Sequence, residues 1–155
     1  PEEAIQNTLN SFEGLPHRLE FVKKIGSIRF YNDSKATNVD SLKRSIQSFN
    51  KNIILIAGGR DKGGNFALLK PLIREKVKFL ILFGEAKNLI NSELKEETDT
   101  QMVDSLEEAV QSAFLRSQPF DIVLFSPGCA SFDMFKNYEH RGNCFKKIIR
   151  ELKHN

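Results

Sequence analysis

The sequence predicts a doubly wound α/β fold, with a mostly parallel sheet, helices on both of its faces and one hairpin at an edge. Two observations support this prediction. Short apolar runs alternate with stretches in which apolar residues recur every three or four positions, which is the alternation that a parallel sheet requires. Only the two runs around Gly26 lack a helix between them, so we expect them to pair as a hairpin. The layering of such a fold is Rossmann-like.

The first elements follow from periodicity and turn chemistry. Residues 1–12 fit a short helix because their apolar residues lie four positions apart, and residues 13–16 form a turn. The runs at 19–24 and 27–32 are rich in aromatic and branched residues, so they form the two hairpin strands.

Beyond the hairpin, helices and strands alternate. Asn38 or Asp40 caps a helix that ends near Phe49. Most of the later strands are continuous apolar runs, typical of strands buried on both faces of a parallel sheet. The remaining elements are, in order, a strand at 52–57, a helix at 65–75, a strand at 77–83, a helix at 86–94, a brief strand at 101–103, a helix capped by Asp104 or Ser105, a strand at 121–125, and helices at 131–138 and 142–152.

Composition narrows the class of protein. The 155 residues suffice for one domain with a sizeable core. The net charge of +3 is small, and basic residues are scattered among acidic ones, which argues against a nucleic-acid partner. No apolar run approaches the roughly 20 residues that span a membrane, and no signal peptide is apparent. Cys129 and Cys144 lack metal-ligand spacing, which favours reduced thiols in a cytoplasmic protein without a metal site of its own.

Three of the predicted strands end in polar or glycine-rich turns, at residues 33–38, 58–64 and 126–131. Such turns meet in one crevice of an open α/β sheet, so we expect a single pocket for a small anionic molecule. Ser131 is expected to cap the helix at 131–138, whose N-terminal N–H groups and dipole would attract an anion. A cap with no ligand is the alternative.

The first two turns carry side chains that suit the same ligand. Asp33 is placed to accept a hydrogen bond from a ribose hydroxyl, or else to close an Asx-turn. Lys35 and Thr37 suit an anion, and Lys62 stands among glycines that let a ligand approach the backbone. No nucleophile–base pair or carboxylate pair stands out, so the chain is expected to hold substrates rather than to form a bond alone.

Several motifs occur together in an order that points to one family. They lie at residues 14–18, 31–38, 58–63, 83–85 and 126–142, and so cover nearly the whole chain. They resemble the C-terminal domain of the Mur ligases, most closely the members that add D-glutamate. Gly128 stands where the family often has Ala, and Tyr138 where Phe is frequent.

The resemblance implies an ATP-dependent amide-bond ligase of peptidoglycan precursor synthesis. In that reaction ATP phosphorylates the carboxylate of UDP-N-acetylmuramoyl-L-alanine, and the amine of D-glutamate attacks the acyl phosphate. ATP and Mg²⁺ would be held mainly by a central domain, and the UDP sugar by an N-terminal domain, both absent from this chain. Residues 1–14 would then end a preceding linker or helix, and residues 15–155 would be the C-terminal domain. The chain alone is expected to be inactive, monomeric and free of membrane contact.

The resemblance also implies roles for individual residues. Lys35 and His17 would lie close to the reacting groups and act in catalysis. Arg18 would reach the nucleotide phosphates and Asp33 the ribose. Contacts to D-glutamate would come from Lys62, Thr37 and Ser131, with the backbone at Phe132 and around Tyr138.

Three alternatives remain at this point. A ligase of the same superfamily could add a diamino acid or D-Ala-D-Ala, or polyglutamylate folate, although the Asp-Ser-Lys-Ala-Thr-Asn run at 33–38 speaks against this. A Rossmann-type oxidoreductase would need a Gly-x-Gly-x-x-Gly fingerprint, and a P-loop enzyme its own motif, and both motifs are absent. A non-catalytic, anion-binding Rossmann-like module would show the same polar turns.

Overall fold

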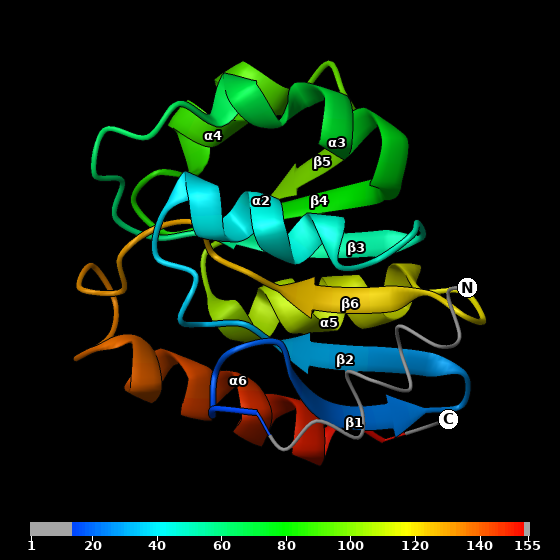
Figure 1. Ribbon diagram of the computed structural model, residues 1–155. Helices are drawn as coiled ribbons and strands as arrows, with labels where there is room; N and C mark the ends of the chain where they lie inside the picture. The colour runs from blue at the N-terminus through cyan, green and yellow to red at the C-terminus, as the bar shows by residue number, and fades with distance from the viewer. Residues whose placement is uncertain (1–13, 154–155) are drawn as a thin grey trace.

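Figure 1 shows a computed structural model of the chain, which describes residues 14–153. The helix predicted at 1–12 lies outside the described residues. The described part of the chain forms a six-stranded sheet in the order β1-β2-β6-β3-β4-β5. Its strands are β1 (Glu20–Ile25), β2 (Ile28–Asn32), β3 (Ile53–Gly58), β4 (Val77–Phe83), β5 (Asp99–Met102) and β6 (Ile122–Phe125).

Neighbouring strands are parallel except β1 and β2, which pair antiparallel at one edge of the sheet. The mostly parallel sheet with an edge hairpin is therefore confirmed. At the opposite edge, β5 begins at Asp99, so the strand predicted at 101–103 was placed two residues late. Its polar sequence has no strand pattern of its own, and pairing with β4, from Phe79 opposite Asp99 to Leu82 opposite Met102, makes it a strand.

Helices cover both faces of the sheet, as predicted (Figure 1). One face carries α2 (Val39–Gln47), the 3₁₀ helix η1 (Phe66–Leu69), α3 (Lys70–Lys76) and α4 (Lys87–Leu94), and the other carries α5 (Leu106–Arg116) and α6 (Tyr138–Glu151). In β3, Ile53 and Leu55 join the first hydrophobic cluster, while Ile54 and Ile56 join the second. Successive strand side chains point to opposite faces, which explains why β3 is apolar throughout.

Side-chain caps decide where two helices begin. Asn38 rather than Asp40 caps α2, because its side chain accepts a hydrogen bond from the Ser41 N–H at 2.8 Å. Ser105 rather than Asp104 caps α5, and its hydroxyl accepts from the Glu108 N–H at 3.1 Å. Both helices thus follow the capping chemistry that the sequence offered.

The single helix predicted at 65–75 is wrong, because this segment is divided into η1 and α3. The Asn65 side chain caps η1 by accepting from the Ala67 N–H at 3.2 Å. A continuous α-helix would need an N–H at position 71 for the Ala67 carbonyl, and Pro71 has none. That carbonyl accepts instead from Lys70, and Pro71 lies in the first turn of α3, where its missing N–H is harmless.

The helix predicted at 131–138 is also wrong, and with it the role of Ser131 as an N-cap. Residues 131–137 form turns, in which the Ser131 carbonyl accepts from the Met134 N–H (3.3 Å) and the Phe135 N–H (2.9 Å). The cap lies later, at Asn137, whose side chain accepts from the His140 N–H at 2.7 Å. One helix, α6, therefore covers the whole stretch from Tyr138 to Glu151.

Candidate functional site

The three polar turns lie side by side at the carboxyl edge of the sheet. Because β6 lies between β2 and β3, the turn that follows β6 sits between the other two. Main-chain hydrogen bonds join it to both neighbours: Gly128 N to Ala36 O (2.8 Å), Gly58 N to Pro127 O (2.9 Å), and Arg60 and Ala130 to each other (2.9 Å each). The predicted convergence of the three turns is confirmed.

Asp33 lies beneath the first turn and is only 3% exposed. Its Oδ1 accepts from the Leu19 N–H at 3.1 Å, and its Oδ2 accepts from the hydroxyls of Ser45 and Ser126. Burial raises the pKa of Asp33, although these hydrogen bonds oppose the effect. Among residues 14–153, Oδ1 receives a single hydrogen bond, so it keeps acceptor capacity for a ligand.

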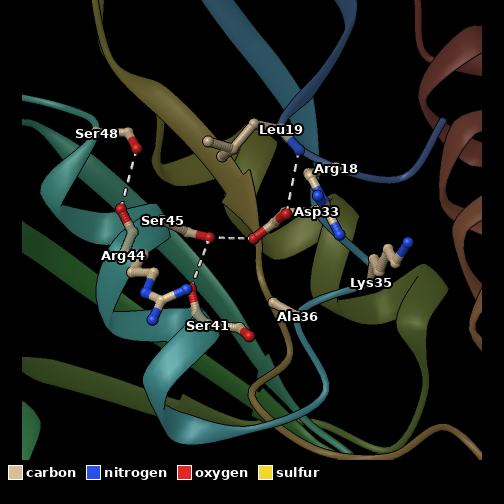
Figure 2. A pocket seen from close by; sticks show the side chains of 9 residues that line it. All are labelled: Arg18, Leu19, Asp33, Lys35, Ala36, Ser41, Arg44, Ser45 and Ser48. Carbon is tan, nitrogen blue, oxygen red and sulfur yellow. Dashed lines mark hydrogen bonds between the residues drawn. The ribbon is translucent and has the colours of Figure 1, made fainter. Parts of the chain in front are cut away.

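A pocket of about 260 Å³ opens beside Asp33 (Figure 2). Figure 2 shows Arg18 and Arg44 on opposite sides of the contact between Asp33 and Ser45. With Lys35, they give the pocket three basic side chains beside one buried carboxylate, and Arg44 is also ion-paired with the exposed Asp40 at 2.9 Å. This combination suits an anion that also carries hydroxyl groups. The pocket is lined by Arg18, Leu19, Asp33, Lys35, Ala36, Ser41, Arg44, Ser45 and Ser48.

His17 is a buried residue, 5% exposed, with an unusual backbone conformation (φ 68°). A histidine in the left-handed region is held there by its surroundings. Its backbone N–H donates to Glu20 Oε1 (3.1 Å), and its ring Nδ1 lies 2.9 Å from Asn32 Nδ2. The ring packs on α6 at Gly142, where a Cβ atom would lie 2.1 Å from Nδ1. Burial, and then the charge of Lys146, lower the pKa of His17.

Tyr138 brings together the two residues expected to act in catalysis. Its ring lies 5.8 Å from Lys35 Nζ and stands edge-on to the His17 ring at a centroid distance of 6.1 Å. The Lys35 N–H also donates to the His17 carbonyl at 3.0 Å. The first residue of α6 thus joins the turn after β2 to the segment before β1.

The second turn presents Lys62 as an exposed cation with no hydrogen bond to residues 14–153. Lys62 and Asp61 both act electrostatically on the Cys129 thiol, so this turn lies near the third. Gly59 allows the approach: its φ is 136°, and a Cβ atom there would lie 2.5 Å from the Ala130 carbonyl oxygen. A free cation is therefore held beside the third turn.

In the third turn, Ser131 is 2% exposed, whereas the side chain of Phe132 projects into solvent. The N-terminal N–H groups that we expected at Ser131 belong to a single turn rather than to a helix, so the helix-dipole argument for an anion site does not apply there. Thr37 is half-buried in the neighbouring first turn. What remains for an anion is hydroxyl groups and the cation of Lys62.

Arg141 organises the site and was not singled out from the sequence. It is 1% exposed, and its guanidinium donates to Ser34 O (2.7 Å), Ser34 Oγ (3.0 Å) and Cys129 O (3.0 Å). The Ser34 hydroxyl in turn donates to the Tyr138 carbonyl at 2.8 Å. One buried cation thus connects the first turn, the third turn and the start of α6. Burial lowers its pKa to about 10.

Some kinds of chemistry find no support in the described residues. Burial raises the pKa of the Cys129 thiol to about 12, so it is not a reactive thiolate. Within residues 14–153, no three His, Cys, Asp or Glu side chains are grouped to hold a metal ion. Over the same range, every helix is too short or too polar to cross a bilayer.

The chain resembles known proteins in both sequence and structure. The sequence pattern of the family described as Mur ligase, glutamate ligase domain, matches residues 17–129. The chain is 50% identical, over 97% of its length, to the UDP-N-acetylmuramoylalanine--D-glutamate ligase of Bdellovibrio bacteriovorus, and 52% identical, over 93%, to that of Geotalea uraniireducens. It spans 32% of the length of each of these relatives.

Solved structures share the fold at low sequence identity. The UDP-N-acetylmuramate-alanine ligase MurC of Thermotoga maritima superposes with a TM-score of 0.63 at 14% identity, over 92% of this chain and 32% of that one. E. coli FolC, solved with ADP, gives 0.61 at 18% identity, over 88% of this chain and 32% of that one. These likenesses concern the fold alone, whereas the sequence match extends over most of the chain. The chain belongs to the family of Mur ligase glutamate ligase domains.

Proposed function

We propose that residues 15–155 are the C-terminal domain of a cytoplasmic ligase that joins D-glutamate to UDP-N-acetylmuramoyl-L-alanine at the expense of ATP. Residues 1–14 would end the linker from the preceding domain. The observation that carries the proposal is the identity of about half of all residues to two ligases of that name, over more than nine-tenths of the chain. The convergence of the three polar turns supports it independently.

D-glutamate would bind between the second and third turns. It offers two carboxylates and one amine, so its site needs a cation and several neutral donors. Lys62 supplies a cation that is free of any bond within the described residues. Thr37 and Ser131 would add hydroxyls, and the backbone at Phe132 and Tyr138 further contacts. The carboxylates would be fixed in this way while the amine stays free to attack.

The nucleotide would occupy the pocket beside Asp33 (Figure 2). Arg18 would reach a phosphate, and Oδ1 of Asp33 would accept from a ribose hydroxyl. A ligand of the same kind is found in E. coli FolC, which shares this fold and was solved with ADP. Mg²⁺ and most contacts to ATP would fall to a central domain.

Lys35 and His17 would act next to the reacting groups. They flank the ring of Tyr138, and Lys35 also lines the pocket beside Asp33. In the proposed reaction the substrate carboxylate attacks the γ-phosphate of ATP, giving an acyl phosphate and ADP, and Lys35 would offset the negative charge of the transferred phosphoryl group.

The test is ADP release by the ligase that contains this domain, with ATP, Mg²⁺ and UDP-N-acetylmuramoyl-L-alanine. D-glutamate, L-glutamate, L-lysine and diaminopimelate are compared as the incoming amino acid. Release with D-glutamate alone is expected. Release only with another amino acid would overturn D-glutamate as the substrate, and release with none of them would overturn the proposed ligase activity. Residues 1–155 alone should release no ADP.

A further inference from the structure

The orientation of the Asn32 side chain can be determined from its partners. Asn32, the last residue of β2, is fully buried. Its Oδ1 lies 3.2 Å from the Ser34 N–H, and its Nδ2 lies 3.0 Å from Glu20 Oε1. A backbone N–H can only donate and an ionised carboxylate can only accept. The two ends of the amide therefore cannot be exchanged.

This orientation determines the protonation of His17. The same Nδ2 lies 2.9 Å from Nδ1 of the His17 ring. Because Nδ2 is a donor, Nδ1 must accept and carries no proton. In a neutral imidazole the proton then lies on Nε2. Within residues 14–153, Nε2 has no hydrogen-bond partner, so the fold itself does not use its N–H.

Glu20 holds this arrangement in place. Its Oε1 accepts from the backbone N–H of His17 (3.1 Å) and from the side-chain amide of Asn32. Its Oε2 accepts from Lys146 Nζ (3.1 Å). Burial acts to raise the pKa of Glu20, but the hydrogen bonds from His17, Lys146 and Asn32 outweigh it and lower the pKa. Glu20 therefore stays ionised and remains an acceptor.

Burial and one nearby cation act in the same direction as this geometry. Burial lowers the pKa of His17 most, and Lys146 on α6 lowers it further, while Glu20 on β1 and Glu139 on α6 oppose them. A second proton on the ring would also point at the amide N–H of Asn32. The neutral ring is thus favoured by both geometry and burial.

We propose that Asn32 and Glu20 are positioning residues that lock His17 in the neutral Nε2–H tautomer, so that His17 serves the reaction as a hydrogen-bond donor and not as a general base. The proposal rests on the proposed function only in placing the reacting groups next to His17. The tautomer itself is a property of this chain and can be measured without any substrate.

The first test is nitrogen NMR of residues 1–155 uniformly labelled with ¹⁵N. Long-range proton–nitrogen spectra near neutral pH should show the His17 Nδ1 unprotonated and Nε2 bearing the proton. Titration towards acid should leave this pattern unchanged until the ring finally protonates. A ring protonated on Nδ1, or a mixture of the two tautomers, would overturn the proposal without any variant being made.

The second test is Asn32→Asp, which keeps the shape of the side chain but replaces its donor with an acceptor. The tautomer should change to Nδ1–H, and the midpoint of His17 titration should rise by about 1–3 pH units, because a carboxylate then faces the ring. Asn88→Asp makes the same charge change on the exposed surface of α4 and should leave the His17 spectrum as in the wild type.

The pH dependence of kcat distinguishes a hydrogen-bond donor at His17 from a general base. In the ligase that contains Asn32→Asp, Nε2 loses its proton above the raised midpoint, so kcat should fall by about 100-fold as the pH rises through it. The wild type and Asn88→Asp should show no such fall. A general base at Nε2 would instead become more active in Asn32→Asp, and that result, or an unchanged pH profile, would overturn the proposal. Failure of the proposed function is distinct, since the wild type would then release no ADP with D-glutamate.

Discussion

The buried guanidinium of Arg141 connects separate parts of this site. The Arg141 guanidinium is enclosed, yet each of its described bonds goes to a neutral oxygen rather than to a carboxylate. Two of those oxygens are main-chain carbonyls, of Ser34 and Cys129, and both residues are fully buried. The side chain thus connects two turns and the start of a helix through hydrogen bonds to neutral oxygens.

Truncating this side chain should be strongly destabilising. In Arg141→Ala, the carbonyls of Ser34 and Cys129 lose a charged donor and stay buried, so the free energy of unfolding should fall by about 3 kcal/mol or more. The free energy of unfolding should fall less in Arg141→Lys, because the Lys ammonium can still donate to part of this set of oxygens. Urea denaturation measures both. Arg150→Ala, at an exposed position on the same helix, is the control. If Arg141→Ala unfolded at the same urea concentration as the wild type, this role of Arg141 would be refuted.

Lys62 offers the matching test of substrate binding. In the ligase, Lys62→Ala should raise the KM for D-glutamate and lower kcat, because a charge-assisted contact of about 1.5–3 kcal/mol is lost, or about 10- to 150-fold in kcat/KM. Steady-state kinetics with varied D-glutamate measures the effect. Lys51→Ala removes an exposed cation at the amino end of β3, away from the site, and should change little. Unchanged constants in Lys62→Ala would remove this residue from the binding site.

Helix α6 is the element that joins the site to the second face of the sheet. It begins at Tyr138, beside His17 and Lys35, and its inner residues Phe145 and Ile149 lie in the second hydrophobic cluster. Gly142 interrupts the sequence pattern of this helix because the His17 ring occupies the space of a side chain. The glycine serves the contact between two elements rather than a turn.

Filling that space should disturb both partners. In Gly142→Ala, the new methyl group would meet the His17 ring, and the free energy of unfolding should fall by about 1–3 kcal/mol despite the better helix propensity of Ala. Asn143→Ala, exposed on the same turn of α6, should instead be within about 0.5 kcal/mol of the wild type. Chemical denaturation compares the two. Greater stability in Gly142→Ala would show that His17 does not occupy this space.

The two hydrophobic clusters sandwich the sheet, and Asp33 is buried where three segments meet on it. Its Oδ2 accepts from Ser45 on α2 and from Ser126 after β6, and its Oδ1 accepts from Leu19 before β1. Ionisation of this carboxylate therefore acts on the stability of the complete fold.

The pH dependence of folding should reveal this burial. The pKa of Asp33 is raised in the folded state, so the fold binds its proton more tightly than the unfolded chain does. Stability from this group is then fully present below the unfolded pKa and is lost as the pH rises through the folded pKa. Asp33→Asn cannot ionise, and its amide can donate to the two serine hydroxyls. Its stability relative to the wild type should therefore improve between about pH 4 and neutrality.

Urea unfolding at a series of pH values measures that difference. Asp40→Asn makes the same charge change at an exposed position of α2 and gives the baseline. A difference that stays flat with pH, or that increasingly favours the wild type, would contradict the burial of an ionisable carboxylate at this position.

Local patterns in the chain were sufficient for most of the fold. Continuous apolar runs predicted β3, β4 and β6, because strands buried on both faces need apolar side chains on both sides. The hairpin and the caps at Asn38 and Ser105 follow from equally local chemistry. The meeting of the three polar turns also followed, since parallel strands end at the same edge of a sheet. The roles given to Lys62, Thr37, Ser131 and the other site residues remain predictions.

Contacts between distant parts of the chain decided the rest. The stretch at 131–137 offers Ser131 as a candidate N-cap, but the Asp133 side chain accepts from the Glu85 N–H at 3.0 Å, a partner 48 positions away, and Asn137 caps α6. Arg141 lies 107 positions from Ser34, so nothing local marks it as buried. The tautomer of His17 depends on Asn32 and Glu20, which meet only across the hairpin. Hydrogen-bond partners of this kind lie far apart in the sequence and meet only in the folded chain, so local periodicity does not predict them.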